Sequence, residues 1–257
     1  MRINSISLAL SVLLLSACGQ ESAEAPAAEA AAPEPAAARA TLTEQLEARK
    51  ERSLGMAPPD RVAATTAAIE EIVASGILER AIKKGDKAPD FTLPNAIGES
   101  VSLKDELAKG PVILTWYRGS WCPYCNLQLH DYQMSLDAIA AAGAQLIAVS
   151  PELPDSALTW KEKEELVFAV LSDLGNKVGH EYGVVYRIPD GISAGYVRGG
   201  RNDLTEYNGD DSLELPLAVT YVIDTDGTVV YSFVDGDYRK RAETSDVVAV
   251  VTQLAAE

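Results

Sequence analysis

The sequence predicts an α/β protein in which a central mixed β-sheet is flanked by helices and preceded by a helical extension. From about residue 85 onward, apolar runs of strand length alternate with longer segments of helical pattern. Near the end, Asp226-Gly227 joins two strand patterns directly, which adds an antiparallel hairpin to the sheet. Apolar residues make up 47% of the 257 residues, enough to bury a core.

The first seventeen residues, 1–17, have the pattern of a secretion signal. A basic start precedes an apolar run over 6–15, which is too short to span a bilayer as a mature helix. Residues 15–19 (LSACG) then resemble a bacterial lipobox, which implies that Cys18 carries lipid. By the same resemblance, Gly19 favours the outer membrane. We therefore expect an extracytoplasmic protein held to a bacterial membrane only by its lipid anchor.

Two segments separate this signal from the main domain. Residues 18–41 are rich in Ala, Pro and Glu with almost nothing to bury, which predicts a disordered tether after the lipidated cysteine. Residues 42–84 are predicted to form the helical extension, packed on the main domain or used as a dimerisation arm. Its helices are expected over 43–53, over 61–75 with Asp60 as the N-cap, and over 77–84.

The main domain is predicted over residues 85–257. Its strand patterns lie at 111–117, 144–149, 167–171, 218–223 and 228–234. Its helical patterns lie at 123–142, 155–166, 174–183 and from 244 to the end. This order, β-α-β-α followed by a hairpin and a helix, is that of a thioredoxin fold. A Gly-rich, acidic insertion around 188–215 lacks strong periodicity and is predicted as a surface excursion rather than a lid.

Charge and composition exclude several functions. The chain has 22 Lys and Arg against 38 Asp and Glu, a formal net charge of −16, which argues against a nucleic acid partner. Two histidines and three cysteines argue against a His-rich metal site and against a disulfide-dense scaffold. We expect neither a metal nor a cofactor.

Cys122 and Cys125 form a C-x-x-C pair where the apolar strand at 111–117 is followed by a helix. A helix N-terminus offers free N–H groups and a positive partial charge, which stabilise a thiolate. Pro123 suits the first helical turn, where its missing N–H costs nothing. The pattern predicts a redox-active pair. The alternatives are a structural disulfide, for which the short spacing is poor, and half a zinc site, for which no second pair follows.

Neighbouring residues are candidates for supporting roles. Arg118, four residues before Cys122, is placed to lower a thiolate pKa or to orient a substrate oxygen, with a surface arginine as the alternative. Trp121 is predicted to form a partner-docking surface, and Trp116 to lie in the core. Glu152 follows a strand end, where sites in α/β folds collect, but is predicted as a solvated loop acid.

Several short motifs resemble the AhpC/TSA peroxiredoxin family. They are 85–94 (GDKAPDFTLP), 149–152 (VSPE), 182–184 (YGV) and 223–227 (IDTDG). The resemblance covers about residues 85–257. It implies a thioredoxin fold, a thiol-based reaction with small peroxides, and a dithiol reductant such as a thioredoxin-like protein.

The resemblance leaves open which sulfur attacks. In the peroxiredoxin pattern P-x-x-x-[TS]-x-x-C, Cys125 takes the peroxidatic position and Cys122 the Thr position. In the thioredoxin pattern W-C-x-x-C, Cys122 is the exposed nucleophile and Cys125 resolves it. Ala218 lies where many peroxiredoxins carry an arginine and thioredoxins a cis-proline, and Trp116 lies where thioredoxins place an acid.

Three hypotheses follow. The first is a peroxidase, in which a thiolate becomes a sulfenic acid and condenses with its neighbour to a Cys122–Cys125 disulfide that an external dithiol resets. The second is a lipid-anchored thiol-disulfide oxidoreductase that acts on protein disulfides. The third is a non-catalytic lipoprotein scaffold, which the intact C-x-x-C makes the weakest. The surrounding architecture favours the peroxidase.

Overall fold

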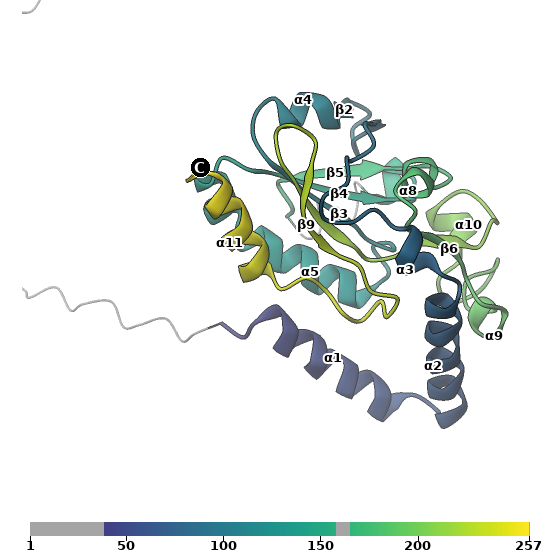
Figure 1. The fold of residues 1–257 in the computed structure, drawn as a ribbon. Coiled ribbons are helices and arrows are strands. Elements are labelled where there is room, and N and C mark those ends of the chain that lie inside the picture. The colour runs from purple at the N-terminus through teal and green to yellow at the C-terminus, as the bar shows by residue number, and fades with distance from the viewer. Residues whose placement is uncertain (1–38, 158–164, 257) are drawn as a thin grey trace, which may run out of the picture. The chain divides into compact units, whose positions relative to one another are not determined.

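The computed structural model describes residues 39–157 and 165–256 (Figure 1). The predicted signal, Cys18 with its predicted lipid, and nearly all of the predicted tether lie outside the described residues, as does most of the helix expected over 155–166. Within the described ranges, no helix combines the length and the apolar character needed to cross a membrane.

A five-stranded mixed sheet forms the centre of the described domain. Its strands in spatial order are β5 (Ala169–Ser172), β4 (Gln145–Ser150), β3 (Val112–Trp116), β8 (Thr220–Ile223) and β9 (Val229–Phe233). The first three are parallel, and β8 and β9 are antiparallel to their neighbours. Gly227, in the turn between β8 and β9, has φ +82°, which glycine adopts without strain. The predicted fold class is confirmed.

Helices and hydrophobic cores cover both faces of this sheet. On one face lie α1 (Leu42–Met56), α5 (Pro123–Gln133), α6 (Leu136–Ala141) and α11 (Thr244–Leu254). On the other lie α2 (Pro59–Ala74), α3 (Ile77–Arg80), α4 (Leu103–Leu107), α8 (Lys177–Glu181) and α10 (Leu204–Tyr207). Strand β3 is buried throughout. Ile113 points into the core on the α5 face of the sheet, and Leu114 points into the core on the α2 face. An apolar run at the middle of the sheet is therefore required.

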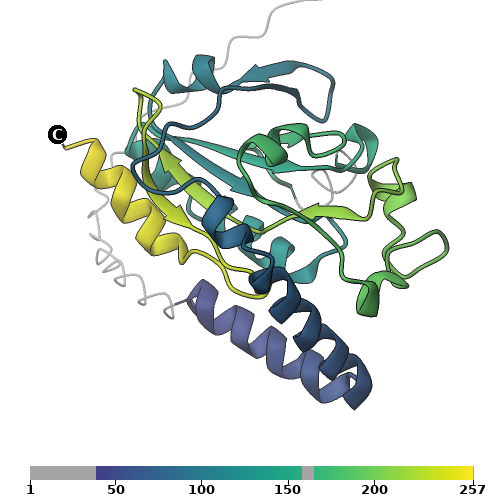
Figure 2. The ribbon, with the colours of Figure 1, turned by 45° about the vertical axis from the view of Figure 1, so that its right-hand side comes forward.

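Helix α1 packs beneath α5 and α11, and α2 runs beside the domain edge (Figures 1 and 2). Thr41 and Glu44 form a reciprocal capping box at the start of α1, and Leu42 and Leu46 are buried. The Asp60 cap is wrong, because α2 begins at Pro59 and Asp60 lies inside its first turn. Proline at the first helical position starts α2 without a side-chain cap.

Two further expectations need correction. The helix expected over 123–142 is two helices, since α5 ends at Gln133 with Met134 as its C-cap, and Ser135 is the N-cap of α6. The Ser135 hydroxyl donates to the Asp131 carbonyl, a local hydrogen bond that competes with helix continuation. The third extension helix ends at Arg80 because Ala81 adopts an extended conformation.

The segment around 188–215 contains regular structure despite its lack of periodicity. It holds α9 (Asp190–Ser193) and α10, and it leads into β7 (Glu214–Pro216), which pairs with β6 (Val185–Arg187). A second small hairpin, β1 (Thr92–Pro94) with β2 (Ser100–Ser102), lies in the segment that resembles the family opening. Elements this short are not recognisable from periodicity.

Candidate active site

The cysteine pair lies at the start of α5, immediately after the loop that leaves β3. Cys122 is the N-cap, Pro123 occupies the first turn, and Cys125 follows within that turn. The backbone N–H of Cys125 and that of Asn126 both donate to the Cys122 carbonyl, at 3.0 and 3.1 Å. Both cysteines are free thiols, with residue exposures of 1% for Cys122 and 0% for Cys125. The exposed nucleophile of the thioredoxin pattern is therefore absent at Cys122.

Arg118 lies in an aromatic box and is not a surface residue, since it is only 3% exposed. Its guanidinium carbon lies 4.3 Å from the ring centre of Tyr238, 5.0 Å from Trp121 and 5.8 Å from Tyr196. Its Nη2 also donates to the Tyr196 hydroxyl at 2.9 Å. Cation–π contacts of this kind hold a guanidinium in place. Trp121 thus forms one wall of the box.

Tyr196 belongs to the 188–215 segment, so the expectation of a plain surface excursion is wrong. The Trp121 ring meets Tyr196 edge-on at 5.6 Å, and Tyr207 from the same segment lies 6.5 Å away. Tyr238 comes from the loop between β9 and α11 and packs on Tyr124 of α5. The site is therefore covered by segments far apart in the sequence.

A second arginine, Arg241, contacts the pair directly. Its Nη2 donates to the Cys125 Sγ at 3.2 Å, and the residue is 5% exposed. The other terminal nitrogen of the guanidinium, Nη1, donates to the main-chain oxygens of Tyr238 and Lys240. Sequence reasoning missed Arg241, because 116 residues separate it from Cys125 and no local pattern marks it.

The pKa values of the two thiols are shifted in opposite directions. Burial opposes the charged form of Cys122, but a hydrogen bond from Cys125 and the charges of Arg118 and Arg241 lower its pKa to about 5. Burial raises the pKa of Cys125, as does the hydrogen bond to Cys122, while Arg241 acts to lower it. At neutral pH the pair therefore holds a Cys122 thiolate that accepts a hydrogen bond from the Cys125 thiol.

Glu152 is buried, so its interpretation as a solvated loop acid is wrong. It lies two residues after β4, and its Oε1 accepts a hydrogen bond from the Ser120 hydroxyl at 2.7 Å. Burial raises its pKa, while hydrogen bonds from Ser120 and Tyr117 act in the opposite sense. Ser120 stands two residues before Cys122, so this carboxyl group holds the loop that leads into the site.

Ala218 is a buried core residue, and Val219 beside it pairs with β3 through its carbonyl. The described residues contain no cis peptide bond. The position at which the family pattern expects an arginine is thus filled by an alanine. Positive charge reaches the sulfurs from Arg118 and Arg241 instead.

Comparison with known proteins places the chain in one family. The AhpC/TSA family model matches residues 84–232. Chloroplastic peroxiredoxin Q of Triticum aestivum is 28% identical over 198 residues, which cover 77% of this chain and 80% of that protein. Chloroplastic peroxiredoxin Q of Oryza sativa subsp. japonica is 32% identical over 152 residues, which cover 59% of each. The chain likewise spans 59% of the length of two Mycobacterium tuberculosis relatives that are 37% identical over 94 residues.

Solved structures share the fold. Peroxidoxin BcpB from Mycobacterium tuberculosis matches with a TM-score of 0.52 at 21% identity, covering 67% of this chain and 97% of that one. The reduced 2-Cys peroxiredoxin of Plasmodium vivax matches with a TM-score of 0.53 at 18% identity, covering 68% and 83%. At such identities the likeness concerns the fold alone.

Proposed function

Because this chain belongs to the AhpC/TSA family, we propose that it is a thiol peroxidase whose Cys122 thiolate reduces a small hydroperoxide. The observation that carries the proposal is the state of Cys122. The residue occupies the N-cap position of α5, lies near two buried arginines, and has a pKa lowered to about 5. A thiolate at neutral pH is the nucleophile that cleavage of a peroxide O–O bond requires.

The proposed reaction has three steps. The Cys122 thiolate attacks one peroxide oxygen, the O–O bond breaks, and the alkoxide or hydroxide that leaves takes a proton from water. Cys122 is now a sulfenic acid, and Cys125 attacks its sulfur, which forms the Cys122–Cys125 disulfide and releases water. A dithiol reductant, such as a thioredoxin-like protein, then reduces the disulfide by exchange and becomes oxidised itself.

Burial of the pair favours a small oxidant over a protein disulfide. Cys122 is 1% exposed and belongs to a hydrophobic core against which Trp121 and Tyr238 of the aromatic box pack. A hydroperoxide needs only a narrow path to this sulfur, whereas mixed-disulfide exchange brings a second polypeptide to it. This supports peroxide as the oxidising substrate of the reduced protein; the dithiol reductant meets only the oxidised pair.

Stopped-flow fluorescence of the reduced protein, mixed anaerobically with hydrogen peroxide, tests the proposal, because Trp121 precedes the pair. We expect oxidation far faster than that of a free thiol, abolished in Cys122→Ser. Cys125→Ser should still react once and leave a sulfenic acid on Cys122, which dimedone traps and mass spectrometry locates. Sulfenic acid on Cys125 in the Cys122→Ser variant would assign the attack to Cys125. Slow reaction with peroxide but rapid oxidation by a protein disulfide would place the protein in the exchange class.

We further propose that Cys18 is lipidated and anchors the protein to the outer membrane, on its periplasmic side. The proposal is supported by the apolar run over 6–15 and the lipobox-like LSACG at 15–19. Metabolic labelling with a palmitate analogue tests it: the wild-type chain should incorporate label and fractionate with outer membranes, and Cys18→Ser should do neither. Label-free, soluble wild-type protein would refute the anchor.

A further inference from the structure

Arg241 has a contact that the attack on peroxide does not use. Its Nη2 donates to the Cys125 Sγ at 3.2 Å, not to the sulfur proposed to attack. The charges of both arginines lower the pKa of Cys122, but the guanidinium of Arg118 lies in the aromatic box, four residues before that thiol. Two buried guanidinium groups therefore lie near the cysteine pair, and Arg241 is the one that donates a hydrogen bond to the Cys125 sulfur.

Conversion of the Cys122 sulfenic acid to the disulfide requires Cys125 to ionise. A thiolate is the species that attacks sulfur, so Cys125 must lose its proton before or while it forms the disulfide. Cys125 is completely buried, and burial disfavours its charged form. Once Cys122 is a sulfenic acid, it no longer holds the negative charge that opposed ionisation of its neighbour. A donor fixed on the Cys125 sulfur then determines how readily the thiolate forms.

We propose that Arg241 is the catalytic residue of the resolving step, where its guanidinium stabilises the Cys125 thiolate that attacks the Cys122 sulfenic acid. This inference rests on the proposed peroxidase function. In the step, the Cys125 sulfur forms a bond to the Cys122 sulfur and the S–O bond breaks. Hydroxide leaves and combines with the proton that Cys125 released, so the products are the disulfide and water. Cys125 is oxidised as the sulfenic acid is reduced, and no further reactant is needed.

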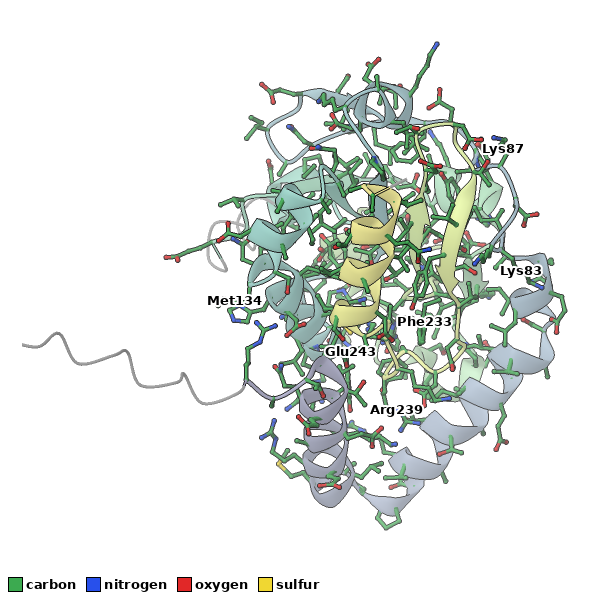
Figure 3. All side chains as sticks on the ribbon, turned by 60° about the vertical axis from the view of Figure 1, so that its left-hand side comes forward. Lys83, Lys87, Met134, Phe233, Arg239 and Glu243 are labelled. Atoms are coloured by element: carbon green, nitrogen blue, oxygen red, sulfur yellow. The ribbon has the colours of Figure 1, made fainter. Side chains whose placement is uncertain are left out.

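The surrounding loop fixes the position of Arg241. Its Nη1 donates to the carbonyls of Tyr238 and Lys240, which leaves Nη2 directed at the sulfur. Two residues later, the Glu243 carboxylate accepts hydrogen bonds from the first turn of α1, so α1 holds the end of the loop that carries Arg241 (Figure 3). A guanidinium held by main-chain acceptors at one end is available for a charge-assisted hydrogen bond at the other.

The test compares Arg241→Met with Lys240→Met, which removes the same charge from the adjacent position. Lys240 is exposed and its side chain pairs with Asp235, and the substitution keeps the main-chain carbonyl that accepts from Arg241. Reduced proteins are mixed with hydrogen peroxide, and two rates are followed by Trp fluorescence and by quenching with dimedone: formation of the sulfenic acid and its conversion to the disulfide.

We expect Arg241→Met to slow disulfide formation about tenfold or more, the effect of losing one charge-assisted hydrogen bond. Sulfenic acid on Cys122 should then accumulate, and the pH at which resolution becomes fast should rise. Sulfenic acid formation should slow much less, and Lys240→Met should match the wild type in both rates. Arg241→Gln, which can still donate to the main-chain oxygens, provides a second neutral variant should the methionine destabilise the fold.

The outcomes separate this inference from the proposed function. Resolution at the wild-type rate in a folded Arg241 variant overturns the role of Arg241 and leaves the peroxidase intact. Equal slowing of both steps also overturns it, because Arg241 would then act on the pair as a whole. If the wild type forms no sulfenic acid with peroxide, the proposed function itself fails.

Discussion

At Cys122, burial and electrostatics act on the thiol in opposite directions. Burial raises its pKa, and the hydrogen bond from Cys125 with the charges of Arg118 and Arg241 lowers it to about 5. Because only the thiolate attacks, the rate constant with peroxide should be roughly constant above about pH 6.5 and fall about tenfold per unit below about pH 5. Stopped-flow measurements across this range, with the thiolate absorbance at 240 nm as a parallel titration, provide the check. A midpoint near the ordinary cysteine value of about 8.5 would contradict the assignment.

A second prediction at this scale concerns the buried carboxyl of Glu152. Its Oε1 accepts from the Ser120 hydroxyl at 2.7 Å, and this bond opposes the effect of burial on the Glu152 pKa. Ser120→Ala should lower the free energy of unfolding by about 1 to 3 kcal/mol near pH 8, because the ionised carboxylate loses a donor. The loss should be smaller near pH 4, where the carboxyl is protonated. Urea unfolding at both pH values measures it, and an equal loss at the two would show that the ionised form is not what Ser120 stabilises.

The site divides into residues that local sequence reveals and residues that it does not. Cys122, Pro123 and Cys125 are identifiable because their chemistry depends on spacing within one helical turn. The roles of Glu152 and Arg241 depend on burial and on contact across the fold, which a single sequence does not display. Arg118 is an intermediate case: its position near the pair is evident, but its box is completed by Tyr196 and Tyr238 from distant segments.

At the scale of elements, Glu243 joins the beginnings of two helices. It is the N-cap of α11, yet its carboxylate accepts from the backbone N–H groups of Leu42 and Thr43, at 3.1 and 2.9 Å, and from the Thr43 hydroxyl at 2.7 Å. Figure 3 shows Glu243 at the end of α11 that faces α1. An acidic group near a helix N-terminus is favourable, so this contact ties α1 to the loop that carries Arg241.

We therefore expect Glu243→Ala to loosen α1 more than it destabilises the domain. The free energy of unfolding should fall by about 1 kcal/mol, as for loss of a helix cap. Amide hydrogen exchange in α1 should accelerate while exchange in β3 stays near that of the wild type. Glu47→Ala, which removes an exposed pair with Lys50 on the same helix, is the matched control. Unchanged exchange in α1 would show that Leu42 and Leu46 alone hold the helix.

The elements were predictable to the extent that their patterns were long. The runs at 111–117 and 144–149 became β3 and β4 because the middle of a parallel sheet must be apolar on both faces. Helix ends were less predictable: the Ser135 hydrogen bond divides α5 from α6, and Pro59 rather than Asp60 begins α2. The short elements in 188–215 are ordered by their packing on the site, which periodicity does not register.

At the scale of the whole molecule, the cysteine pair is part of the hydrophobic core. Cys122 and Cys125 belong to the core beneath α1, α5 and α11, together with side chains from β3 and β8. In the reduced protein the Cys122 thiolate provides a negative charge for two buried arginines, Arg118 and Arg241. Formation of the disulfide removes that charge and leaves both guanidinium groups buried without it, which is unfavourable.

The reduced protein should therefore be more stable than the oxidised one. A thiol whose pKa is about 5 when folded and about 8.5 when unfolded adds stability that is present above the unfolded value and is lost as pH falls through 5. The disulfide closes a loop of only four residues, 122–125. Its restriction of the unfolded chain, about 1.9 kcal/mol, therefore offsets only part of the roughly 2.7 kcal/mol that the thiolate adds at pH 7. At pH 7 we expect a net difference of about 1 kcal/mol in favour of the reduced form. Guanidinium unfolding of both forms measures it, and the difference should reverse near pH 4, where Cys122 is protonated. If the oxidised form were the more stable at pH 7, the thiolate would not be the counter-charge of Arg118 and Arg241, and the pair would be a structural disulfide rather than one readily reset by a dithiol.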